Sequence, residues 1–153
     1  MTTQALTGTV EFTNGIQNKA SGDVGGVQGG PKLLLRLEGA AVFLAGLLAW
    51  SHEGGSWLHF PLLFLVPDLS MLGYLHSPRI GALLYNTGHS YLLPFMLAGL
   101  GLLLSHHALL LAAILWGTHI GFDRLMGYGL KYPTRFFDTH LGYAGPRASK
   151  AGA

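Results

Sequence analysis

The stretch Ala108–Gly127, ALLLAAILWGTHIGFDRLMG, decides the fold that we expect for this chain. It is long enough to cross the roughly 30 Å of bilayer hydrocarbon as an α-helix, at about 1.5 Å per residue. His119 and Asp123 lie four residues apart within it, so both side chains fall on one face of that helix. An apolar span that carries ionisable side chains predicts a membrane helix with a polar site, because unpaired charge in hydrocarbon is costly.

Three further apolar stretches precede this one in the chain. They are Leu33–Trp50, Trp57–Leu75 and Ile80–Leu104. The connectors between the four stretches are short, so consecutive helices are expected to run antiparallel. We therefore predict an all-α fold, namely an integral membrane four-helix bundle with short connectors and flexible termini.

The ends of the chain differ in composition from this apolar region. Residues 1–30 are rich in Gly, Thr and Asn, and residues 146–153 are short and polar. Such segments bury too little apolar surface to offset the entropy of ordering them. We expect flexible tails at residues 1–30 and 146–153 and a four-helix transmembrane domain at residues 31–145.

Composition narrows the class of protein. Only 10% of the residues are charged, whereas soluble domains average about 25%. The absence of cysteine excludes disulfide scaffolds, iron–sulfur clusters and cysteine nucleophiles. A net charge of +2 without a basic stripe predicts no nucleic-acid partner. Membrane lipids are the expected partners, and a homo-oligomer is left open.

The positions of the cations predict an orientation in the membrane. All nine Lys and Arg residues fall before the first stretch, early in it, in the second connector, or late in and after the fourth stretch. They are Lys19, Lys32, Arg36, Arg79, Arg124, Lys131, Arg135, Arg147 and Lys150. Because cytoplasmic loops carry the excess of Lys and Arg, we predict a multi-pass protein of the inner (plasma) membrane with both termini cytoplasmic.

Six polar side chains are expected at one level, in the cytoplasmic half of the four spans. They are Glu38, Asp68, Asn86, His89, His119 and Asp123. Imidazole, carboxylate and amide groups are ligands that suit a divalent metal ion such as Zn, Mn or Fe. We predict His89, His119, Asp123 and Asn86 as metal ligands. Asp68 or Glu38 would act as a general base on metal-bound water during hydrolysis of an amphiphilic substrate.

Two other interpretations of the polar layer stay open. The same side chains could form an interhelical hydrogen-bond network that fixes helix packing in a non-enzymatic transport or assembly component. They could also belong to a proton path, although the outer half of each span is almost purely apolar. The segment after the fourth span, with Asp138 and His140, either folds back over the layer as a lid or forms a surface loop.

Several motifs resemble those of a bacterial membrane family, the one catalogued as domain of unknown function 4260. The motifs are Leu35–Gly39 (LRLEG), Pro67–Tyr74 (PDLSMLGY), Tyr85–His89 (YNTGH), His119–Tyr132 (HIGFDRLMGYGLKY) and Asp138–Leu141 (DTHL). The resemblance covers about Lys32 to Gly142. It implies a compact multi-span membrane protein without an established activity. The quoted motifs include all six polar residues that are expected at one level.

Overall fold

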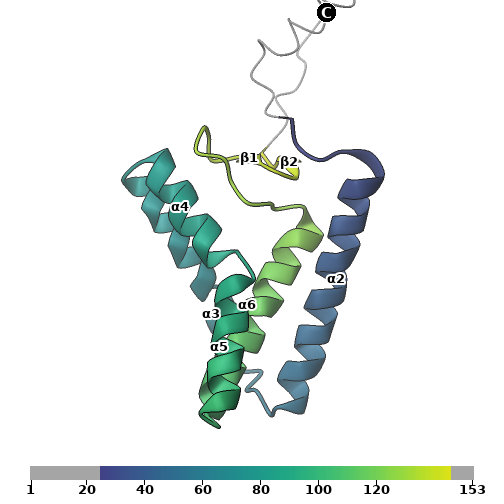
Figure 1. Cartoon of the computed structure of the whole chain (residues 1–153), viewed down its shortest axis with the longest axis vertical. Coiled ribbons are helices and arrows are strands. Elements are labelled where there is room, and N and C mark those ends of the chain that lie inside the picture. Colours follow the sequence, from purple (N-terminus) through teal and green to yellow (C-terminus); the bar gives the residue numbers. More distant parts are fainter. Residues whose placement is uncertain (1–24, 146–153) are drawn as a thin grey trace, which may run out of the picture.

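The computed structural model describes residues 25–145, which are mostly helical (Figure 1). The elements are α2 (Gly29–His52), α3 (Phe60–Phe64), the 3-10 helix η1 (Val66–Leu75), α4 (Pro78–Gly88), α5 (Leu92–Leu103), α6 (His107–Met126), β1 (Asp138–Thr139) and β2 (Gly142–Tyr143). The two short strands pair in antiparallel fashion. The helical fold class is thus confirmed. Residues 1–24 and 146–153 of the expected tails lie outside the described residues, whereas residues 25–28 lead into α2 and residues 29–30 belong to it.

Helix α6 is the centre of the fold and packs against α2, α3 and α5 (Figure 1). Its contact with α2 is close enough that the backbones nearly touch. A Cβ atom added at Gly121 would lie 2.7 Å from Phe43 N and 3.0 Å from Gly39 O. At about 1.5 Å per residue, α2 and α6 are roughly 36 and 30 Å long. Both helices are therefore long and apolar enough to cross a membrane.

The second and third predicted spans are not continuous helices, so the expected four-helix membrane bundle is not confirmed. In the second, α3 gives way to η1 near Pro67, which has no backbone N–H to donate. Asp68 N instead donates to Leu65 O at 3.1 Å, the i to i+3 pattern of a 3-10 helix. In the third, the chain leaves the helix between α4 and α5, around His89. The described chain has two long helices and two broken ones.

The described residues combine buried polar side chains with many exposed large apolar ones. The polar side chains of His89, Thr118 and His119 are at most 2% exposed. Large apolar side chains lie on the outside instead, for example Leu48 at 73% and Leu103 at 84%. Soluble proteins rarely expose contiguous apolar patches of such extent, because they would associate through them. The arrangement suits a lipid environment on the outside and a polar interior.

The segment after α6 covers one end of the molecule, between α2 and α4 (Figure 1). Gly127 ends α6 in the left-handed conformation, with φ of 92°, which glycine adopts without strain. The chain then returns through the β1–β2 hairpin, and Val27 N donates to His140 O at 2.8 Å. Of the two alternatives for this segment, the structure therefore shows the one in which it folds back over the helices.

Candidate metal centre

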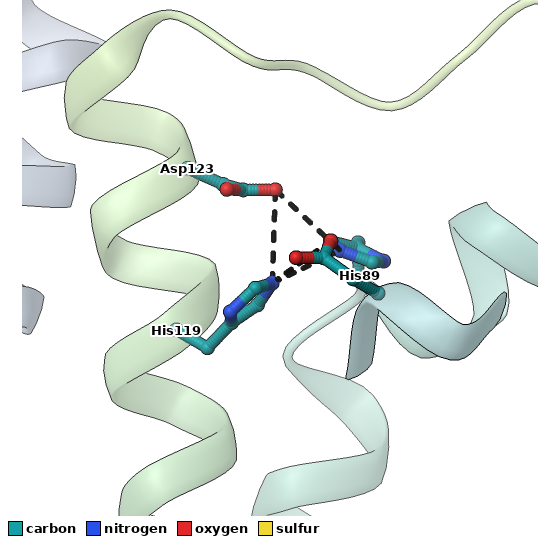
Figure 2. Close-up of side chains that lie close together, drawn as sticks. His89, His119 and Asp123 are labelled. Atoms are coloured by element: carbon teal, nitrogen blue, oxygen red, sulfur yellow. Dashed lines mark hydrogen bonds and ion pairs between the residues drawn. The ribbon is translucent and has the colours of Figure 1, made fainter. Parts of the chain in front are cut away.

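Four predicted polar residues meet in one group, Asp68, His89, His119 and Asp123. Each offers one ligand atom, and these four atoms all lie within 4.8 Å of one another. His119 and Asp123 come from successive turns of α6, as their spacing predicted, while Asp68 comes from η1 and His89 follows α4. Figure 2 shows His89, His119 and Asp123 pointing toward one another. The group therefore joins both broken helices to α6.

Five distances within the group range from 3.2 to 3.9 Å, around the edge length of a tetrahedron of ligands about a small metal ion. His89 Nε2 lies 3.2 Å from His119 Nε2, 3.4 Å from Asp68 Oδ1 and 3.5 Å from Asp123 Oδ2. His119 Nε2 lies 3.5 Å from Asp68 Oδ1 and 3.9 Å from Asp123 Oδ2. Metal–ligand bonds of about 2.0–2.2 Å give tetrahedral edges of roughly 3.3–3.6 Å. The residues present therefore fit a small divalent cation.

The helix break after α4 is what places His89. Its Nδ1 lies 3.0 Å from Tyr85 O, the carbonyl one turn earlier. Two further carbonyls at the break accept from α6, Gly88 O from Trp116 Nε1 at 2.7 Å and His89 O from Arg124 Nη2 at 3.0 Å. These bonds satisfy groups that the end of a helix otherwise leaves unpaired. The break is thus held by side chains and aims the imidazole at α6.

These contacts leave the centre of the group rich in hydrogen-bond acceptors. Because His89 Nδ1 carries the proton that is donated to Tyr85 O, its Nε2 presents a lone pair. Two carboxylates face the same point, from Asp68 and Asp123. Tyr85 Oη donates to Asp123 Oδ2 from one side, and a proton on His119 Nε2 could serve only one of the remaining acceptors. A cation at the centre would satisfy all of them.

Outer contacts hold Asp123 and His119 unequally. Tyr85 Oη donates to Asp123 Oδ2 at 3.0 Å, and the Tyr85 ring stacks on His89 with centroids 3.8 Å apart. Partners of this kind orient metal ligands. His119 packs edge-on against Phe64, and its buried Nδ1 has no hydrogen-bond partner among residues 25–145. His89 and Asp123 are therefore held by more contacts than His119.

Two of the six predicted site residues do not join the group. Glu38 is exposed on α2 and is absent from the group of four ligand atoms, so the expectation that it meets the other carboxylates is not met. Asn86 uses its amide on the backbone of Lys131: Asn86 Nδ2 donates to Lys131 O at 2.9 Å, and Lys131 N donates to Asn86 Oδ1 at 2.7 Å. Asn86 was predicted as a metal ligand, but its amide is already paired with the backbone of Lys131.

A cavity of about 340 Å³ opens beside the group. Polar side chains of Asp68, Tyr85, His119, Asp123, Lys131 and Thr139 line it together with aromatic rings, among them Phe64, Phe122, Phe136 and Phe137. Asp68 is the more accessible carboxylate, with its side chain 34% exposed against 10% for Asp123. The group therefore has an open side, and the segment after α6 forms part of the cavity wall.

Sequence reasoning did not single out Lys131 as a site residue, although it counted this residue among the cations. Only 8% exposed, Lys131 lines the same cavity, on a stretch between Gly127 and Pro133 that is rich in aromatic residues. Burial lowers the pKa of Lys131 to about 8. The aromatic residues on both sides of Lys131 in the sequence were the available signal. Its side chain lines the cavity only because the segment after α6 folds back over the helices.

Comparison with known proteins places the chain in a family. No curated protein and no solved structure is found to be similar to it. One family model, described as a domain of unknown function (DUF4260), matches residues 32–144, close to the range that the motifs suggested. This match includes all four residues of the candidate metal centre and the segment that covers them. The chain therefore belongs to the DUF4260 family.

Proposed function

We propose that this protein is a multi-pass inner-membrane protein that binds a divalent metal ion and uses it to hydrolyse an amphiphilic substrate. The observation that carries the proposal is the convergence of Asp68, His89, His119 and Asp123 within 4.8 Å. Such a group is expensive to bury in a mostly apolar chain unless a cation neutralises it. A binding cavity opens on the same group, so a ligand could reach it.

The residues divide naturally into two roles. His89, His119 and Asp123 are buried and would hold the ion, which matches the three protein ligands common in catalytic zinc sites. Asp68 lies on the cavity side and would act as the general base on an attacking water molecule. A divalent ion would supply Lewis-acid activation there. Glu38, the other base predicted from the sequence, lies outside the group and has no part in this proposal.

The proposed membrane location is supported by the exposed apolar side chains and by the positions of Lys and Arg along the chain. Helices α2 and α6 are each long enough to span a bilayer, and many leucines point outward. The helix breaks at α3–η1 and α4–α5 lie against α6, where non-helical backbone is tolerated inside a membrane protein. The positions of Lys and Arg favour a cytoplasmic location for both termini. The candidate centre would then open toward the cytoplasm.

The test is metal content. Protein purified in an uncharged detergent, without chelators, is expected to contain about one divalent ion per chain by elemental analysis. His119→Ala is expected to lose it, because one of two imidazole ligands is gone. His76→Ala is the matched control, since His76 is exposed at the end of η1 and lies outside the group.

Two results would count against a metal centre. One is protein that contains no ion and binds no added Zn²⁺, Mn²⁺ or Fe²⁺ in equilibrium dialysis. The other is a His119→Ala variant that retains the ion of the wild type.

A second candidate is a non-enzymatic component in which the same group only locks the helices together. It is favoured by the hydrogen bond from Tyr85 to Asp123 and by the contact of His89 Nε2 with His119 Nε2. Chelation distinguishes the two candidates. A ligand that binds only the folded state stabilises it, so removing a bound metal lowers the melting temperature and adding it back restores that temperature. A purely structural network would melt at one temperature with or without chelator.

A further inference from the structure

The backbone of Lys131 is held in place from two sides. Asn86 pairs with both its N–H and its carbonyl group, and Lys131 also bridges to Thr139 in the returning strand. These contacts fix where the side chain begins, just beyond the end of α6. They also explain why Asn86, a half-buried residue of α4, is not part of the group of four ligand atoms.

The side chain of Lys131 then runs across a set of aromatic rings. Its Nζ lies 3.4 Å from the ring centroid of Phe136, 4.5 Å from that of Tyr85 and 5.3 Å from that of Tyr74. Ring faces attract a cation without neutralising it. With a pKa of about 8, lowered by burial, the amine is mainly protonated at neutral pH. The structure thus keeps a positive charge inside the cavity.

This ammonium has no anion of its own. Within the described part of the chain it forms no ion pair with Asp68 or Asp123, whose partners are the two histidines. A lysine ammonium has three donors and is strongly hydrated, so burying it without an acceptor is unfavourable. The cavity that it lines supplies the space for an acceptor.

A bound metal ion would change the charge balance of the site. Asp68 and Asp123 line the same cavity as Lys131. A divalent ion would offset the charge of these two carboxylates, so that the ammonium of Lys131 would be left to attract an anion. Anion binding by this cavity is then expected to require both the ion and the lysine.

We propose that Lys131 and the metal group together form a binding site for the phosphate of an anionic amphiphile. This proposal rests on the proposed function, whose substrate class it narrows from amphiphiles in general to phosphate-bearing ones. Phe64, Phe122, Phe136 and Phe137 line the same cavity and would contact the apolar part of such a molecule. Lys131 would bind the phosphate, while His89, His119 and Asp123 would hold the metal ion.

The experiment measures phosphate near the metal. Protein in dodecyl maltoside is loaded with Mn²⁺, and the ³¹P relaxation rates of inorganic phosphate and of dodecyl phosphate are titrated. Phosphorus close to the ion relaxes faster, and this contribution is expected in the wild type. The Lys131→Met variant is expected to bind phosphate at least about tenfold more weakly, because a charge-assisted contact is lost. Tighter binding of dodecyl phosphate than of inorganic phosphate would identify the amphiphile rather than the free anion as the ligand.

Lys32→Met is the matched control, since it removes a cation from α2 that does not line the cavity. It is expected to bind phosphate as the wild type does. Methionine should fit among the rings of Lys131, and the variant is expected to bind Mn²⁺ at least as tightly as the wild type, because a nearby positive charge is gone.

The possible outcomes separate this proposal from the one on which it rests. If no variant binds Mn²⁺, the metal centre itself is wrong. If Mn²⁺ binds and phosphate relaxation is the same in Lys131→Met as in the wild type, the metal centre stands and the phosphate site is wrong. Equal affinity for inorganic and dodecyl phosphate would overturn the amphiphile as ligand.

Discussion

Single side chains around the group have separable tasks. Asp68 and Asp123 are both carboxylates, but one reaches the cavity and the other accepts from Tyr85. His89 has its proton placed by a backbone carbonyl, whereas His119 Nδ1 has no such partner in residues 25–145. Most of the orienting contacts therefore converge on Tyr85, which bonds Asp123 and stacks on His89.

Tyr85→Phe tests this orienting role. It removes the hydrogen bond to Asp123 but keeps the ring that stacks on His89. Metal affinity is expected to fall about 10- to 100-fold, as is usual when an outer partner of a ligand is lost. Competition with a chelator of known affinity measures the change. Tyr91→Phe, at a half-buried tyrosine outside the group, is expected to leave the affinity unaltered, and an equal loss in both variants would contradict the role given to Tyr85.

At the scale of elements, the broken helices matter more than the long ones. Helices α2 and α6 provide length and close packing, but α2 contributes no ligand to the group. The breaks at α3–η1 and α4–α5 bring Asp68 and His89 to α6. A break inside an apolar environment requires partners for the freed carbonyl groups, and Trp116 and Arg124 of α6 supply them.

Trp116→Phe tests the stability of the break after α4. The variant leaves Gly88 O without its donor, which is expected to cost about 1–3 kcal/mol of unfolding free energy beyond the loss of ring volume. Trp50→Phe is the matched control, because Trp50 is buried and its Nε1 has no partner in the described residues. Thermal melting in detergent is expected to show a lower midpoint for Trp116→Phe than for Trp50→Phe. The reverse order would show that the indole hydrogen bond does not support the break.

At the scale of the whole molecule, the two ends differ in their content of Lys and Arg. The start of α2 and the end of α6 lie on the side of the molecule that carries the β1–β2 hairpin (Figure 1). The turns after α2 and α5 lie on the opposite side. The described cations of α2 and of the segment after α6 belong to the side of the hairpin, and the turns after α2 and α5 contain no Lys or Arg. Such asymmetry sets the orientation of multi-span proteins.

Fusions to alkaline phosphatase, which is active only outside the cytoplasm, test this orientation. We expect an inactive fusion at the C-terminus and an active one at Gly54, in the turn after α2. A green fluorescent protein fusion at the C-terminus should fluoresce, which controls for expression. An active phosphatase at the C-terminus would show that the candidate site opens on the outer side.

The sequence by itself determined the helical class and the apolar character of the chain, and it singled out the four polar residues that meet. The apolar lengths and the spacing of His119 and Asp123 on one helix are local features, which a sequence contains. Tertiary structure alone decided that Glu38 lies outside the group, that Asn86 holds a backbone segment and that Lys131 enters the cavity. It also decided where two spans break. The physical reason is that a carbonyl or an amide forms a hydrogen bond only with a group that the fold brings within bonding distance. The spacing of residues along the chain does not show which elements pack together.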